Sequence, residues 1–133
     1  MTGTLTDLTA GHVFPPTNMR IDAERVRAYC AATGDTLSLY QDAGVAPSLA
    51  VAAFALGVLL ESVSLPAGSL HASEALSFQA PIPLDAEVEC RAVLAQRSVR
   101  GGYVVSVLES DIVLNGSTAL TARATVMSPA PTS

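Results

Sequence analysis

The residue types that could carry acid–base chemistry gather in the segment TGDTLSLYQDAG, residues 33–44. It places a carboxylate, Asp35, five residues before a phenol, Tyr40. Acid–base catalysis needs a proton acceptor and a proton donor within hydrogen-bonding reach of the same reacting group. Because an unperturbed tyrosine has a pKa near ~10, Tyr40 is a poor base at neutral pH. Asp35 follows a helix-stopping glycine, where aspartate is common in turns, so the segment favours turn and packing roles over catalysis.

The other reactive residue types lack partners in the sequence. His71 opens a predicted strand, and without a carboxylate placed beside it we expect it to be structural or on the surface. Neither Ser38 nor Ser48 lies in a Gly-x-Ser-x-Gly elbow. Cys30 and Cys90 belong to no CxxC or Cys/His cluster, so we expect two buried, reduced thiols. The sequence therefore predicts neither a metal site nor a cofactor.

The composition favours one domain with a partner subunit. A chain of 133 residues is long enough to bury a core as a single domain. Half of the residues are hydrophobic and only 14% are charged, so part of the surface is expected to be covered by another chain. The net charge is −5 and the seven Lys and Arg residues are scattered, which disfavours nucleic acid and anionic membranes as partners.

Neither a signal peptide nor a membrane span is predicted. The amino terminus, MTGTLTDLTAGH, has neither the basic start nor the apolar run of a signal peptide, so we expect a cytoplasmic location. The apolar stretch at 47–66 is interrupted by Glu61 before it reaches the ~18 residues of a span. It predicts a buried helix in a water-soluble domain.

Two helices are predicted in the first half of the chain. Asp22 is a plausible N-cap for a helix that ends near Gly34, with an apolar stripe that includes Val26. A second helix is predicted from Pro47 to about Ser64. Because it is apolar nearly all round, it must be covered on most sides.

Four antiparallel strands are predicted in the second half, where the hydrophobic period changes to two. They span about 71–80, 86–100, 103–115 and 117–128, with hairpin turns at Gly101–Gly102 and Asn115–Gly116. Helices followed by strands indicate an α+β fold, and a sheet wrapped around one long helix is the hot-dog arrangement. We expect a single domain over 1–128, a disordered tail over 129–133, and a free sheet edge on the strands from 86 to 128.

The order of these pieces resembles a known family. The pieces are Gly11, ERVRAYCAATGD, LYQD, Pro47 at the start of the central helix, GSLHASEALSFQAPIPLDAEVECRAVL, and RGGYVVSVLESDIVLNGSTALTARATV. From end to end the chain resembles a single hot-dog domain of the MaoC-like family. That family includes (R)-specific enoyl-CoA hydratases and 3-hydroxyacyl thioester dehydratases.

The resemblance implies a degenerate catalytic motif. The family signature is similar to Asp-x-Asn-Pro-x-His, in which Asp and His activate a water molecule. On this sequence the positions fall on Asp35, Leu37, Ser38 and Tyr40. The resemblance therefore implies no catalytic residue here and a non-catalytic subunit that helps to bind an acyl thioester, delivered by CoA or by an acyl carrier. The substrate-binding positions that it implies are Asp35, Tyr40, Pro47 and Ser48.

Partners and alternative activities follow from the same resemblance. It implies a homodimer, or a heterodimer with a catalytic MaoC-like chain. One alternative is an active hydro-lyase, a hydratase or dehydratase that uses Asp35 with an unusual partner. Another is a thioesterase with a carboxylate on the central helix, where Glu61 is the one candidate. Since Glu61 sits near the end of that helix, we expect it to be an exposed end residue.

Overall fold

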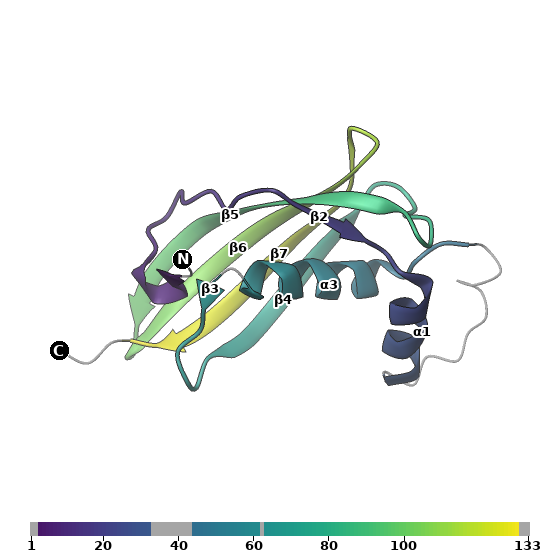
Figure 1. Cartoon of the computed structure of the whole chain (residues 1–133). Helices are drawn as coiled ribbons and strands as arrows, with labels where there is room; N and C mark the ends of the chain where they lie inside the picture. Colours follow the sequence, from purple (N-terminus) through teal and green to yellow (C-terminus); the bar gives the residue numbers. More distant parts are fainter. Residues whose placement is uncertain (1–2, 33–43, 62, 131–133) are drawn as a thin grey trace.

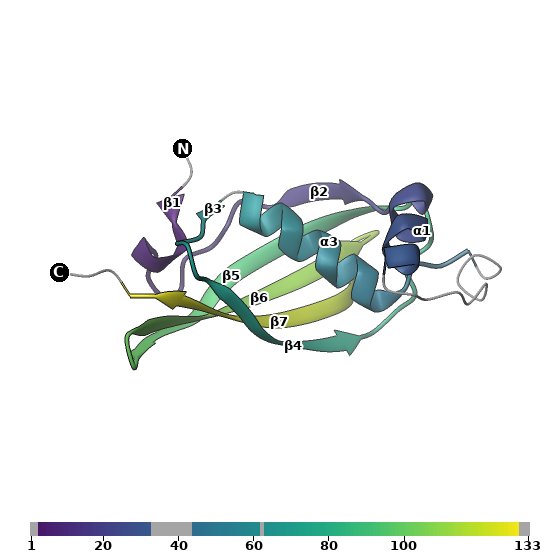
Figure 2. The ribbon, with the colours of Figure 1, turned by 90° about the horizontal axis from the view of Figure 1, so that it is seen from below.

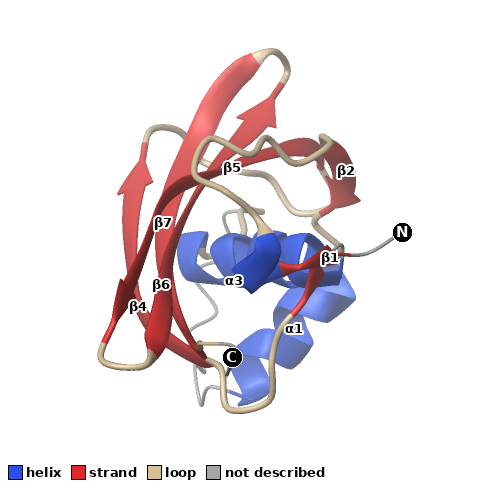
Figure 3. Ribbon diagram, turned by 90° about the vertical axis from the view of Figure 1, so that its left-hand side faces the viewer, coloured by secondary structure: helices blue, strands red, loops and turns tan. Residues whose placement is uncertain are grey.

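The computed structural model of the chain describes residues 3–32, 44–61 and 63–130. Its main feature is a five-stranded antiparallel sheet that curves around one helix, α3 (Ser48–Glu61) (Figure 1). Across the sheet the order is β2 (Thr17–Arg20), β5 (Glu87–Arg100), β6 (Tyr103–Leu114), β7 (Ser117–Pro129) and β4 (Leu70–Phe78). Helix α3 lies on the concave face of the sheet (Figure 3). The predicted α+β hot-dog arrangement is confirmed.

Shorter elements complete the described part of the chain. Helix α1 (Ala23–Ala32) follows β2 and lies near the amino-terminal end of α3 (Figure 2). Near the other end of α3, β1 (Gly3–Thr4) and β3 (Val63–Ser64) pair in parallel, and a 3-10 turn, η1 (Leu5–Asp7), follows β1. Among the described residues, no helix has the length and hydropathy needed to cross a membrane.

Two aspartates hold the start of α1. The Asp22 carboxylate accepts a hydrogen bond from the Glu24 backbone N–H at 2.8 Å, which confirms the predicted N-cap. Asp85, in the turn before β5, accepts a second one from the Ala23 N–H at 3.1 Å. Asp85 has a φ of 64°, a left-handed conformation that Asp tolerates better than most residues. The turn between β4 and β5 is thereby attached to α1.

The strand pattern follows the predicted period of two. The side chains of Cys90, Ile112 and Leu120 lie opposite one another on adjacent strands, and all three are buried on the face that carries α3. Both predicted hairpin turns are present, and Asn115 takes a positive φ of 51° at the second one. The β6 strand is thus the centre of the core.

The concave face is lined by small side chains where α3 crosses it. Ala92 pairs with Ser110, and Ser110 pairs with Ala122, so a row of small residues runs across β5, β6 and β7. On the helix, Ala52 and Ala55 are buried. Small residues on both surfaces let the helix lie close to the sheet.

Three boundary predictions needed correction. Helix α3 ends at Glu61, and Ser64 belongs instead to β3, which pairs with β1. The strands from 86 to 128 do not form the sheet edges predicted, since β4 pairs with β7 and β2 pairs with β5 over Glu87–Cys90; beyond the bridge at Val93, no described strand pairs with the outer side of β5. Strand β7 continues through Pro129, and the Ala130 N–H donates a hydrogen bond to the Gly102 carbonyl at 2.8 Å. The sheet-edge prediction erred because β2, which pairs with β5, was not recognised as a strand.

The helix is also less covered than its composition predicted. Its sheet-facing side is buried, but Gly57 is exposed and Phe54 and Val58 are only half-buried. The apolar composition of α3 therefore exceeds what this single chain covers. That open face forms part of the site described below.

The central position of Ile112 leads to a stability prediction. The Ile112→Ala variant should lower the free energy of unfolding by about 2–5 kcal/mol, because it leaves a cavity between three interior strands. Urea denaturation followed by circular dichroism measures this. Val99→Ala, at a side chain that is 58% exposed, is the control and should change stability by less than ~0.5 kcal/mol. A loss below ~1 kcal/mol for Ile112→Ala would contradict the assignment of the core.

Candidate functional site

A groove of about 450 Å³ lies where the open face of α3 meets β2 and α1. Its floor is formed by Ala53, Phe54, Gly57 and Val58, which follow one another along one face of the helix. Gly57 has no side chain, and no atom lies within 4 Å of the position a Cβ would take there. The groove is therefore apolar and open along its floor.

Charged side chains stand at opposite ends of this groove. Arg20 of β2 and Arg25 of α1 lie at the end formed by α1. Glu61 ends α3 and lies seven residues beyond Phe54, or about 10 Å further along the helix axis at 1.5 Å per residue. Asp22, just before α1, also lines the groove, so the end formed by α1 carries charges of both signs and the end at Glu61 carries a negative charge.

Both arginines are held by neighbouring groups. The Arg25 guanidinium lies 4.4 Å from the centre of the Phe54 ring, a cation–π contact. The ring of Phe54 in turn meets the ring of Tyr29 edge-on, with 6.0 Å between their centres. Arg20 lies 3.5 Å from the Asp85 carboxylate, the same group that receives the Ala23 N–H. These contacts position both guanidinium groups at the groove.

A narrow cavity lies behind the groove, between α3 and the sheet. It has a volume of about 20 Å³, close to the space of one water molecule. Its walls include Ala55 and Leu59 of α3 and the inward-facing Cys90, Ala92 and Ser110 of the sheet. Val58 lines both this cavity and the groove. One side chain therefore stands between the polar-rimmed groove and the interior.

Cys90, on the wall of that cavity, is a poor nucleophile. Burial, followed by the negative charge of the neighbouring Glu89, raises the pKa of its thiol from 9.0 to about 11. Because the thiolate is the reactive form, the thiol is unreactive near neutral pH. The predicted buried, reduced thiol is confirmed for Cys90, whereas Cys30 is only half-buried.

The sequence-predicted binding residues are only partly described. Asp35 and Tyr40 lie outside the described residues. Pro47 is buried just before α3 and lines neither the groove nor the cavity, and Ser48 begins the helix. Glu61 is an exposed end residue of α3, as expected, but it also stands at the rim of the groove.

His71 is exposed on the edge strand β4, as expected, but it has a carboxylate neighbour that the sequence did not indicate. Its Nε2 lies 3.8 Å from a carboxylate oxygen of Glu74, whose side chain is 14% exposed. Residues three apart on a regular strand face opposite sides. Here the register shifts between His71 and Ser73, so that His71 pairs with Val126 and Glu74 with Ala124, both buried residues. The period-two pattern of the sequence contained no signal for this irregularity.

This His–Glu pair is separate from the groove and the cavity, because it lies on the opposite edge strand, β4. No histidine is among the described residues that line either space. Within the described part of the chain, no three His, Cys, Asp or Glu side chains come together in a way that could hold a metal ion.

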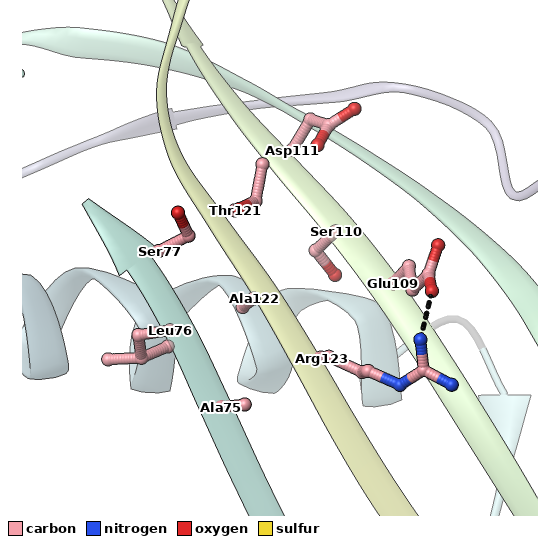
Figure 4. A pocket seen from close by; sticks show the side chains of 9 residues that line it. All are labelled: Ala75, Leu76, Ser77, Glu109, Ser110, Asp111, Thr121, Ala122 and Arg123. Carbon is pink, nitrogen blue, oxygen red and sulfur yellow. Dashed lines mark hydrogen bonds and ion pairs between the residues drawn. The ribbon is translucent and has the colours of Figure 1, made fainter. Parts of the chain in front are cut away.

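A third hollow, of about 380 Å³, lies over β4, β6 and β7. Figure 4 shows Glu109 and Arg123 of this hollow in front of the strands, with α3 behind the strands. Arg123 donates a hydrogen bond to Glu109 across this face at 2.7 Å, and both side chains are nearly half exposed. An exposed ion pair of this kind contributes little to stability. The hollow shares one lining residue, Ser110, with the interior cavity.

Arg20, Arg25 and Phe54 are the site residues that the sequence analysis missed. The two arginines are five residues apart and separated by an N-cap, so they form no run of charge. Phe54 lies in an apolar helix where its exposure could not be distinguished from burial. Their convergence depends on how α1 packs on α3.

Several solved structures share this fold. A MaoC-like dehydratase from Rhodospirillum rubrum matches with a TM-score of 0.75 and 19% identity, over 98% of this chain and 99% of that one. An (R)-hydratase from A. caviae, involved in PHA biosynthesis, matches with a TM-score of 0.72 and 22% identity, over 94% of this chain and 98% of that one. A chain of the truncated HadBC complex, a 3R-hydroxyacyl-ACP dehydratase from Mycobacterium tuberculosis, matches with a TM-score of 0.73 and 17% identity. The match covers 92% of this chain and 99% of that one.

Sequence comparison adds no further relative. No family model matches the chain, and no curated protein is significantly similar to it. The structural matches cover nearly the whole of each chain at low identity, and they establish the fold. The chain has the hot-dog fold of the MaoC-like dehydratases and (R)-hydratases, as the resemblance predicted.

The raised pKa of Cys90 predicts how stability changes at alkaline pH. The folded state keeps this thiol protonated, so its stabilising contribution is complete below pH 9 and is lost as the pH rises toward about 11. Over that range the wild type should lose about 1–2 kcal/mol more unfolding free energy than Cys90→Ala. Urea titrations at several pH values measure both slopes. If the unfolding free energy fell equally with pH in the wild type and in Cys90→Ala, the raised pKa of the Cys90 thiol would be contradicted.

Proposed function

We propose that this chain is a non-catalytic hot-dog subunit that binds part of an acyl thioester in a hydratase or dehydratase system. The observation that carries the proposal is the arrangement around Val58, where a polar-rimmed groove adjoins an apolar cavity in the core. The groove, at about 450 Å³, has the size of a ligand site with an apolar floor and a polar rim, whereas the cavity behind it has the space of about one water molecule. The three solved structures named above are a dehydratase, an (R)-hydratase and a chain of a dehydratase complex, which supports the type of reaction system.

The proposal that the chain is non-catalytic rests on the missing acid–base pair. Addition of water to an enoyl thioester needs both a base and an acid. Tyr40 stands where the family motif has histidine, and no histidine is among the described residues of the groove or cavity. Asp35 alone could orient a water molecule, but the motif positions after it supply no second side chain whose ordinary pKa is near neutral.

We further propose that the subunit dimerises through the free edge of β4. This strand pairs with β7 on one side only, and eight of its nine residues are exposed. Leu70, Leu76 and Phe78 are large exposed apolar side chains on it. A long apolar edge without lysine or proline is a surface that natural proteins cover. The partner is a second copy or a catalytic MaoC-like chain, and the HadBC match comes from a complex of this general kind.

The first test of this proposal is enzymatic. The purified chain alone should not hydrate trans-2-butenoyl-CoA or medium-chain trans-2-enoyl-CoA measurably, and Asp35→Asn should change nothing in that assay. Loss of one acid–base partner commonly lowers the rate by ~10²–10⁴-fold. The assay follows the absorbance of the enoyl thioester.

A gain-of-function variant makes this test sharper. Leu37→Asn, Ser38→Pro and Tyr40→His together restore the spacing of the family motif. Hydration by the triple variant would support an intact binding site. Turnover by the wild type that Asp35→Asn abolishes would instead establish the hydro-lyase alternative. Release of free thiol that Glu61→Gln abolishes would establish the thioesterase alternative.

A second test concerns the β4 edge. Light scattering at micromolar concentration should give a mass of two 13.6 kDa chains. Leu76→Lys places a charge on the exposed edge and should weaken the dimer by at least about tenfold, because like charges would meet across it. Val99→Lys is the control, since Val99 is an exposed apolar residue on β5, which two strands separate from β4. A wild-type monomer would contradict the homodimer, and equal effects of the two variants would contradict the choice of β4.

A further inference from the structure

We infer that the free edge of β4 pairs antiparallel with β4 of a second copy of this chain, about a two-fold axis at Ser77. In this register Leu76 of each copy lies opposite Phe78 of the other. The inference rests on the proposed dimerisation through β4 and specifies both the partner and the register. β4 is an edge strand, and no described strand lies on its outer side (Figure 2).

The backbone of β4 determines which residues can bond to a second strand. The Gln79 N–H donates a hydrogen bond to the Ala119 carbonyl of β7 at 2.9 Å. In an antiparallel ladder, successive residues point their backbone groups alternately toward one neighbour and toward the other. Ser77 therefore uses its backbone groups on β7, whereas those of Leu76 and Phe78 point to the open edge. A second strand would bond to Leu76 and Phe78.

The regular part of β4 limits where the two-fold axis can lie. The register with β7 shifts between His71 and Ser73, and it is regular from Ser73 to Phe78. An irregularity of this kind bends a strand and disrupts pairing on it. We therefore place the axis within residues 73–78. An axis at either end of that range would leave most of it unpaired.

Two large apolar side chains on this part of β4 need cover. Leu76 is 36% exposed and Phe78 is 56% exposed. They pair with Ala122 and Leu120 of β7, which are buried on the face that carries α3, so both side chains lie on that face. Pairing about the axis at Ser77 sets Leu76 of each copy against Phe78 of the other. A second copy thereby covers both apolar side chains at once.

Glu74 argues against the other registers. An axis at Glu74 would set two carboxylates directly opposite each other, and like charges in that position destabilise a sheet. An axis at Ala75 or Leu76 would set Glu74 opposite Leu76 or Phe78, and would bury a carboxylate against an apolar side chain. With the axis at Ser77, Glu74 lies at the end of the paired segment. Its carboxylate stays beside His71, 3.8 Å away, outside the central pairs.

Cysteine cross-linking tests the register. At the axis, the two Ser77 residues form a pair without mutual hydrogen bonds, with their Cα atoms about 4.5 Å apart, which is within the range of a disulfide. Ser77→Cys should therefore form a disulfide-linked dimer under mild oxidation, as measured by non-reducing gel electrophoresis of the full chain. The background carries Cys30→Ser, because that thiol is only half-buried.

Ala75→Cys in the same background is the matched control. Ala75 lies two residues from Ser77 along β4 and on the same face of the strand. In the inferred register the two copies of this position are four residues apart along the strands, or about 14 Å. This distance is too long for a disulfide, so the control should stay unlinked.

Charge substitutions test the same register without a cross-link. Leu76→Glu and Phe78→Lys should each weaken self-association about 10–30-fold, because each variant changes two cross-strand pairs. In a mixture of the two variants, one pair joins the introduced carboxylate to the introduced ammonium, and the other is the native pair of Leu76 and Phe78. The mixture should therefore associate more tightly than either variant alone, as measured by analytical ultracentrifugation.

The outcomes separate the register from the proposed dimer. A disulfide in Ala75→Cys but not in Ser77→Cys would overturn the register and keep the dimer through β4. A mixture that associates no more tightly than its components would also overturn the register. A wild-type monomer, or a dimer that neither charge variant weakens, would overturn the proposed β4 dimer itself.

Discussion

The close packing of α3 on the concave face of the sheet is the contact on which the rest of the structure depends. It is possible because Ala92, Ser110 and Ala122 form a row of small side chains across three strands. Large side chains flank this row, including the fully buried Leu108 and Ile112. The helix therefore lies deep along its sheet-facing side, while its opposite side has nothing in the described chain to cover it fully. Both the core and the groove result from that one contact.

The turn that contains Asp85 connects this core to the candidate site. Its carboxylate receives the Ala23 N–H at the start of α1 and lies 3.5 Å from Arg20 of β2. One side chain thus joins the β4–β5 turn to both walls of the groove. Because α1 has little buried surface of its own, with Val26 its single fully buried residue, its placement relies on this polar attachment and on the contact between Tyr29 and Phe54. The position of Arg25 follows from that placement.

The two sheet edges are used in different ways. β2 is short, at four residues, and its neighbourhood carries the charged groups of the groove. β4 has nine residues, exposes three large apolar side chains, and contains no lysine or arginine. Free backbone groups along such an edge can pair with the strand of another chain. This asymmetry is the physical reason to place the ligand at one side of α3 and the partner chain at the other.

Local sequence patterns predicted the elements of this fold well. The Asp22 cap, both hairpin turns, the apolar helix and the three long strands depend on interactions among residues close in the chain, and the structure confirms them. The degenerate motif at Asp35 and Tyr40 was likewise a matter of residue identity, and it remains a prediction because it lies outside the described residues. The pairing of β2 with β5 was missed, because a four-residue strand has too few positions to show a period.

The site itself depended on contacts between distant segments. His71 and Glu74 share a face only because the register with β7 shifts between them. Arg20, Arg25 and Phe54 converge because α1 packs at the end of α3 and Asp85, more than sixty residues away, holds the junction. Residue types determine which local structures and which chemistry are available. Strand register and helix packing determine which side chains meet. Both depend on the free energy of the whole chain, so they cannot be predicted from any short segment alone.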